Sequence, residues 1–161
     1  MNADPAARRE RDEEPRTTDV TFEQPFPIGE ENAAYAQYFT GRSYLAPLTD
    51  GVPVVSNVTF EPGCRNDWHV HHGTDGGGGG DQILLCTAGS GWYQAEGSDP
   101  VSMTPGTTVR VPAGTKHWHG AKADSWFSHI AFITPGPDVR NEWLEPVDED
   151  TYGHLPGTSA P

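Results

Sequence analysis

Residues 68–85 read WHVHHGTDGGGGGDQILL, and this stretch decides how the fold and the function of the chain are interpreted. His69 and His71 are two positions apart, and in a β-strand such side chains project from the same face. Two neighbouring imidazoles on one face are suited to binding a metal ion. Two histidines on a solvated face would give the same pattern, so both interpretations stay open at this point.

Gln82 begins the apolar run that follows, QILLC. A glutamine that faces a core is costly unless its amide is partnered. Either a metal ion or a backbone hydrogen bond at the strand end would partner it. The glycine run Gly76–Gly80 lacks the Lys-Ser/Thr pair that a phosphate-binding loop requires. We therefore expect a flexible connector there, mobile enough to act as a lid.

A second histidine-bearing stretch, GTTVRVPAGTKHWHG, occupies residues 106–120. Its Pro-x-Gly turn precedes His117 and His119, which share a face if the strand is regular. Further along, His129 alternates with Phe127 and Ala131 in the run SWFSHIAFI. A single histidine in an apolar run is more often a core residue, but the other histidines offer a shared interior site as the alternative.

The rest of the chain favours short strands over long helices. The 161 residues include 19 glycines and 15 prolines, and the apolar runs between them are brief and closely spaced. This pattern predicts an all-β sandwich or barrel. We expect one domain at residues 20–145, after a charged, disordered leader at 1–19 and before a C-terminal tail at 146–161. The run NEWLEPVDEDTY at 141–152 is expected to form a short helix or an edge segment, and the last residues, GHLPGTSAP, are expected to be loose. The runs are RSYLAPL, VPVVSNVTF, DWHVH, QILLCTAG, GWYQAEG, TVRVPAG, KHWHGA and SWFSHIAFI.

The charge and the remaining composition narrow the classes of partner. A formal net charge of −13 at pH 7 argues against nucleic acid and anionic membranes. No apolar stretch approaches the ~20 residues of a membrane helix, and the first residues lack the apolar core of a secretory signal. We therefore predict a cytoplasmic protein that acts on a small molecule. Cys64 and Cys86 are predicted to be buried, reduced thiols.

The two histidine-bearing stretches resemble the two motifs of the cupin superfamily. The first motif lies at 63–89 and the second at 106–121, and the matching positions are Gly63, His69, His71, Gln82, Gly89, Gly106, Pro112, Gly114 and His117. Gln82 replaces the usual glutamate, Ala121 replaces the usual asparagine, and the gap before Gln82 is long. The resemblance covers roughly residues 41–135 and implies a cupin jelly-roll β-barrel.

The segments TFEPGCRNDWHVH, TAGSGWYQAEG and KHWHGA are similar to one group of small single-domain cupins. That group has a His-His-Gln-His metal site and includes the bacterial cupin hydroxynitrile lyases and carboxymuconolactone-decarboxylase-associated cupins. The resemblance implies one divalent metal, with the ligands His69, His71, Gln82 and His117. It also implies a catalytic role for His129, which lies twelve residues after the last ligand. A polyketide cyclase uses a similar site, so the motif leaves the reaction open.

Three imidazoles and an amide are neutral ligands, so a divalent metal bound by them keeps its full charge. Such a metal is a good Lewis acid toward a substrate oxygen and is hard to oxidise. We expect manganese, with zinc, iron, nickel and cobalt as alternatives. The leading hypothesis is a lyase or isomerase of a small hydroxy or carbonyl compound, in which His129 is the general acid or base. The alternatives are a dioxygenase, a polyketide-type cyclase and a non-catalytic binding protein.

The substrate pocket is predicted to be mostly apolar. We expect one wall from the alternating positions of residues 56–60 and another from residues 127–133, with an aromatic side chain over the mouth. The predicted pocket residues are Ser56, Val58, Phe60, His119, Phe127, Ala131, Ile133 and Trp143. Because exposed strand edges favour association, we also expect a homodimer or a higher homo-oligomer.

Overall fold

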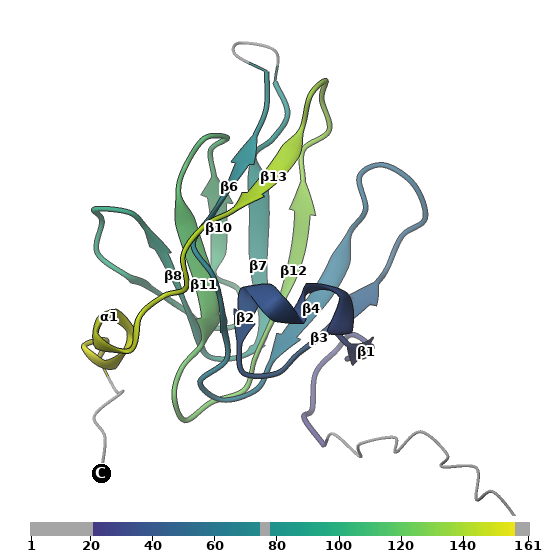
Figure 1. The fold of residues 1–161 in the computed structure, drawn as a ribbon. Coiled ribbons are helices and arrows are strands. Elements are labelled where there is room, and N and C mark those ends of the chain that lie inside the picture. The colour runs from purple at the N-terminus through teal and green to yellow at the C-terminus, as the bar shows by residue number, and fades with distance from the viewer. Residues whose placement is uncertain (1–20, 75–77, 157–161) are drawn as a thin grey trace, which may run out of the picture.

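The computed structural model describes residues 21–74 and 78–156 (Figure 1). The predicted leader at 1–19 lies outside the described residues, and so do residues 75–77 of the glycine-rich loop. Within the part of the chain that is described, no helix has the length and apolar character needed to cross a membrane.

Two antiparallel sheets face each other, which confirms the predicted all-β fold (Figure 1). The strands of the six-stranded sheet, in spatial order, are β1 (Glu30–Glu31), β3 (Ser43–Pro47), β4 (Ser56–Phe60), β12 (Phe127–Ile133), β7 (Gln82–Gly89) and β10 (Thr108–Val111). The seven-stranded sheet contains β13 (Arg140–Trp143), β6 (His69–His72), β11 (His117–Ala121), β5 (Arg65–Asn66), β2 (Phe39–Thr40), β8 (Gly91–Ala95) and β9 (Val101–Met103). A 3-10 helix, η1 (Ala33–Tyr38), and a short α-helix, α1 (Glu149–Gly153), complete the fold.

Strand β7 shows why the apolar runs became strands. Its residues alternate strictly between buried and half-buried, beginning with buried Gln82, so every second side chain faces the interior. All eight predicted runs contain a strand, whereas the two-residue strands β1, β2 and β5 and the three-residue strand β9 are too short to give a pattern.

The hydrophobic core fills the space between the sheets. Phe60, Leu84, Met103 and Phe127 are fully buried there and pack with other apolar side chains. The two cysteines are free and buried, as predicted, and both belong to this core. Buried polar side chains share the interior with this core and contact it, as where the Phe60 ring packs beside His119 and His129.

The C-terminal segment from residue 146, which was predicted to lie outside the barrel domain, is packed against the barrel as far as residue 155. Val147, Tyr152 and Leu155 are buried with Trp92 and Trp118 on the outer side of the seven-stranded sheet. The Tyr152 hydroxyl donates a 2.7 Å hydrogen bond to a backbone carbonyl of β11. The short helix or edge segment expected at residues 141–152 is observed as both, in β13 and α1. The expectation of a loose tail from residue 153 does not hold for Leu155, which is buried in this cluster.

The described part of the glycine run is closely packed. A Cβ atom on Gly79 would lie 2.7 Å from the Cα atom of Gly136, and one on Gly136 would lie 2.5 Å from the carbonyl oxygen of Gly78. Gly80 donates a backbone hydrogen bond of 2.8 Å to Thr134. Glycine is therefore needed at 79, 80 and 136, where the neighbouring backbones leave no room for a Cβ atom. The expected lid motion stays a prediction.

Candidate metal centre

Three of the predicted ligands form a buried cluster in the interior. His69 and His71 project from β6 and His117 projects from the neighbouring strand β11, directly opposite His69. One potential ligand atom from each histidine lies within 4.8 Å of the others. Gln82 reaches the cluster from β7 in the other sheet, with its Oε1 atom 2.9 Å from Nε2 of His117.

Hydrogen bonds fix which nitrogen of each imidazole is free. In each of the three histidines the Nδ1 atom contacts an oxygen. For His69 and His117 this oxygen is a backbone carbonyl, which can only accept a hydrogen bond. Nδ1 therefore carries the proton and Nε2 offers its lone pair, the usual arrangement of metal-binding histidines. The contacts run from His69 to the carbonyl of Asp67 (2.8 Å), from His117 to the carbonyl of Thr115 (2.8 Å) and from His71 to Oδ1 of Asn141 (2.6 Å).

The donor set fits a divalent cation. Nε2 of His71 is buried and has no hydrogen-bond partner among the described residues. Nε2 of His117 and Oε1 of Gln82 are both acceptors, yet they lie 2.9 Å apart. A cation bound between these atoms would partner Nε2 of His71. It would also relieve the repulsion between Nε2 of His117 and Oε1 of Gln82. Imidazole nitrogens and an amide oxygen are suitable ligands for several first-row metals.

Burial keeps the ligand imidazoles neutral. Loss of hydration lowers the pKa of His69 well below its ordinary value, and the neighbouring histidines lower it further. Burial also lowers the pKa of His71, and it lowers the pKa of His117 to about 4. Their lone pairs are therefore available at neutral pH.

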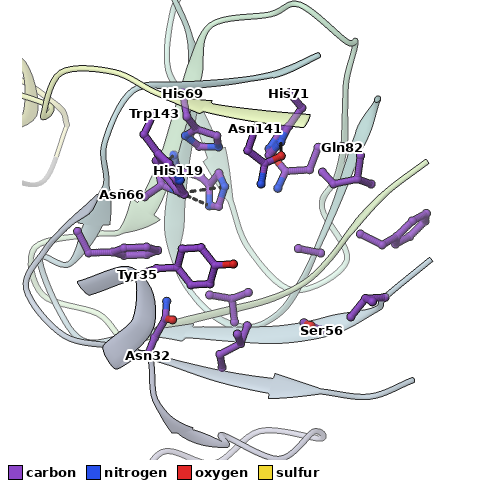
Figure 2. Close-up of a pocket in the computed structure, with 17 residues that line it drawn as sticks. Asn32, Tyr35, Ser56, Asn66, His69, His71, Gln82, His119, Asn141 and Trp143 are labelled. Atoms are coloured by element: carbon purple, nitrogen blue, oxygen red, sulfur yellow. Dashed lines mark hydrogen bonds between the residues drawn. The ribbon is translucent and has the colours of Figure 1, made fainter. Parts of the chain in front are cut away.

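A cavity of about 200 Å³ opens beside the cluster (Figure 2). Figure 2 shows the histidines, Gln82 and Asn141 at one side of this cavity, and Tyr35 and Ser56 at the opposite side. Aliphatic and aromatic side chains supply most of the remaining wall, and among the described residues no Asp, Glu, Lys or Arg lines it. A bound molecule therefore meets neutral protein groups only.

The structure places most of the predicted pocket residues in this wall, namely Ser56, Val58, His119, Ala131, Ile133 and Trp143. Phe60 and Phe127 do not line the cavity, which corrects the prediction for these two residues. Both are fully buried in the core, where their ring centroids are 5.6 Å apart. Alternation along a strand gave the correct face but not the depth at which each side chain lies.

Several lining residues were missed. Tyr35 and Phe39 come from the N-terminal segment around η1, and Asn66 and Asn141 come from short strands. Their positions depend on pairing between distant strands, such as Asn141 of β13 opposite His71 of β6. No local pattern could have found them.

His129 lies behind the cavity wall. It is fully buried on β12, and its Nε2 atom is 3.0 Å from Nδ1 of His119, which does line the cavity. Burial lowers the pKa of His129 to about 4, and burial and the neighbouring histidines lower that of His119. The two imidazoles form a pair that joins β11 of one sheet to β12 of the other. His129 reaches the cavity only through His119.

Comparison with known proteins agrees with this architecture, although no family model matches the sequence. The chain is 35% identical over 121 residues to an (R)-mandelonitrile lyase from Granulicella tundricola, a match that covers 73% of this chain and 87% of the relative. A cupin-like protein from Thermotoga maritima superposes with a TM-score of 0.69 at 34% identity, over 84% of this chain and 96% of that one.

A DMSP lyase from Ruegeria pomeroyi shares the fold at 18% identity, with a TM-score of 0.52 over 79% of this chain and 63% of that one. The fold, the two histidine-bearing motifs and the sequence identity to the first two relatives all indicate the same family. The chain therefore belongs to the cupin superfamily, among the small single-domain cupins that resemble the (R)-mandelonitrile lyase.

Proposed function

We propose that the protein is a metal-dependent cupin lyase that cleaves small hydroxynitriles, with manganese as the expected metal. The observation that carries this proposal is a neutral His-His-Gln-His donor set that opens onto an uncharged, largely apolar cavity, with a buried imidazole pair beside it. The similarity to a protein named (R)-mandelonitrile lyase supports the same reaction class.

His69, His71, Gln82 and His117 would hold the metal. When bound, the metal supplies a Lewis acid for a substrate oxygen. The apolar wall excludes water and accepts the side chain of the substrate, and the absence of charged lining residues favours a neutral substrate.

The imidazole pair supplies the proton transfer. Cleavage of a hydroxynitrile breaks its O–H bond and the carbon–carbon bond to the nitrile, and it yields a carbonyl compound and hydrogen cyanide. The pair accepts the hydroxyl proton and returns it to the departing cyanide, so no net proton is consumed. Because His129 does not line the cavity, it takes part through His119.

The test begins with the metal content of the purified protein and of His69→Ala, measured by elemental analysis. We expect a near-stoichiometric metal in the wild type that is lost in the variant. Mandelonitrile cleavage, followed by benzaldehyde formation, should depend on that metal and fall at least 100-fold in His129→Phe. A well-folded wild type that binds no metal even after reloading would refute the proposal. Oxygen uptake without cyanide release would favour the dioxygenase.

A further inference from the structure

The Asn66 side chain has an orientation that the structure fixes independently of the metal. Asn66 is almost fully buried, and its Oδ1 atom accepts a 2.9 Å hydrogen bond from the backbone N–H of His119. A backbone N–H can only donate, so the acceptor must be the oxygen of the amide. The Nδ2 amino group is therefore the end of the amide that faces the His119 ring (Figure 2).

The amino group lies against the face of that ring. Nδ2 of Asn66 is 3.0 Å from Nε2 and 3.4 Å from Nδ1 of His119. In the plane of the ring, an atom that close to both nitrogens would collide with the ring carbons, so it must lie over the face. This N–H contact with the aromatic face holds the ring in place. It leaves the in-plane hydrogen-bonding position of each ring nitrogen unoccupied by Asn66.

The proton positions in the His119–His129 pair follow from the contact of His129 with a backbone carbonyl. Nδ1 of His129 is 3.3 Å from the carbonyl oxygen of Ile130, which can only accept, so this nitrogen carries the proton. Nε2 of His129 is then an acceptor, and Nδ1 of His119, 3.0 Å away, donates to it. In neutral His119 the remaining nitrogen, Nε2, has a lone pair. The pair therefore offers a proton acceptor to the cavity.

We propose that Asn66 is a positioning residue that fixes the ring plane of His119, so that Nδ1 donates to His129 while Nε2 stays free to accept a substrate proton. When the substrate O–H bond breaks, an N–H bond forms at Nε2 of His119. The Nδ1–H bond of His119 then breaks, and a new N–H bond forms at Nε2 of His129. The return of the proton to cyanide reverses these steps. The role of Asn66 in catalysis rests on the proposed function, whereas the orientation of the His119 ring and the tautomers of the two histidines do not.

The test uses zinc-loaded full-length protein, because diamagnetic zinc permits nitrogen-15 NMR of the histidine rings. In the wild type we expect both His119 and His129 to carry their proton on Nδ1. In Asn66→Ala we expect the His119 signals to become those of exchanging tautomers. Asn57→Ala is the matched control, because Asn57 is a fully buried asparagine that does not line the cavity and whose side chain hydrogen-bonds Gln24, Pro27 and Ser128 instead. It should lower stability and leave these signals unchanged.

Kinetics separate positioning from folding. In Asn66→Ala we expect kcat for mandelonitrile to fall by ~10- to 100-fold while KM changes by less than about threefold and metal content is unchanged. A wild-type His119 with its proton on Nε2, or an Asn66→Ala variant with wild-type tautomers, would overturn the inference. If no cyanohydrin is cleaved at all, the proposed function fails, and the NMR result still decides the role of Asn66 in ring orientation.

Discussion

Asn141 offers the sharpest test of the proposed metal centre, because it orients one predicted ligand without being a predicted ligand itself. Its Oδ1 atom accepts the 2.6 Å hydrogen bond from Nδ1 of His71, the histidine whose other ring nitrogen is buried without a partner. Asn141→Ala leaves the donor of His71 unpaired, which costs about 1–3 kcal/mol. Loss of such an outer contact typically weakens metal binding by ~10- to 100-fold, or about 1.4–2.7 kcal/mol. The cost of the unpaired donor and the expected loss of metal-binding free energy therefore have the same size.

The assay is a competitive titration of metal-free protein against a chelating indicator, with manganese and zinc measured separately. Asn141→Ala should raise the dissociation constant ~10- to 100-fold. Asn141→Asp should bind at least as tightly as the wild type, because a carboxylate accepts the same bond more strongly. Glu142→Gln is the matched control, since the neighbouring Glu142 pairs with His72 instead. If Asn141→Ala binds metal as tightly as Glu142→Gln does, the assigned role of Asn141 is refuted.

Three further predictions concern stability and thiol chemistry. In urea unfolding, Gly89→Ala should lower the free energy of unfolding by at least about 3 kcal/mol, because a Cβ there would overlap a backbone oxygen. Gly63→Ala, which has a similar positive φ but open space around it, should lower it by about 1–2 kcal/mol. Tyr152→Ala should cost about 3 kcal/mol and Tyr152→Phe about 1 kcal/mol, and a wild-type unfolding midpoint for Tyr152→Ala would contradict the packing of the C-terminal segment. Burial raises the pKa of Cys64 to about 12 and that of Cys86 to about 11, so neither thiol should react with a disulfide reagent at pH 8 until the protein is unfolded, and fast reaction of the native protein would count against this burial.

The histidine pattern predicted that His69 and His71 share a face, because side chains two positions apart do so in any strand, and the resemblance to cupins turned this pair into a predicted metal cluster. It brought His69 and His71 together on β6, and the second motif placed His117 beside them. The resemblance to cupins added Gln82 from the opposite sheet. The resemblance therefore supplied the pairing of distant strands that the local pattern could not.

The residues that the sequence did not reveal all depend on such pairing. Asn66 meets His119 because β5 and β11 are adjacent, and Asn141 meets His71 because β13 pairs with β6. Phe60 was assigned to the pocket because it alternates with true lining residues, but it lies deeper, in the core. Periodicity identifies a face of a strand, while depth and neighbours are properties of the assembled barrel.

The metal cluster and the imidazole pair each take members from both sheets: Gln82 and His129 from the six-stranded sheet, and the other histidines from the seven-stranded one. Occupancy of the site would therefore act as a cross-link between the two halves of the sandwich. Binding and folding are then thermodynamically linked, and free metal at 100 times its dissociation constant adds about 2.7 kcal/mol to the free energy of unfolding. Metal supply would set the lifetime of the folded protein as well as its activity.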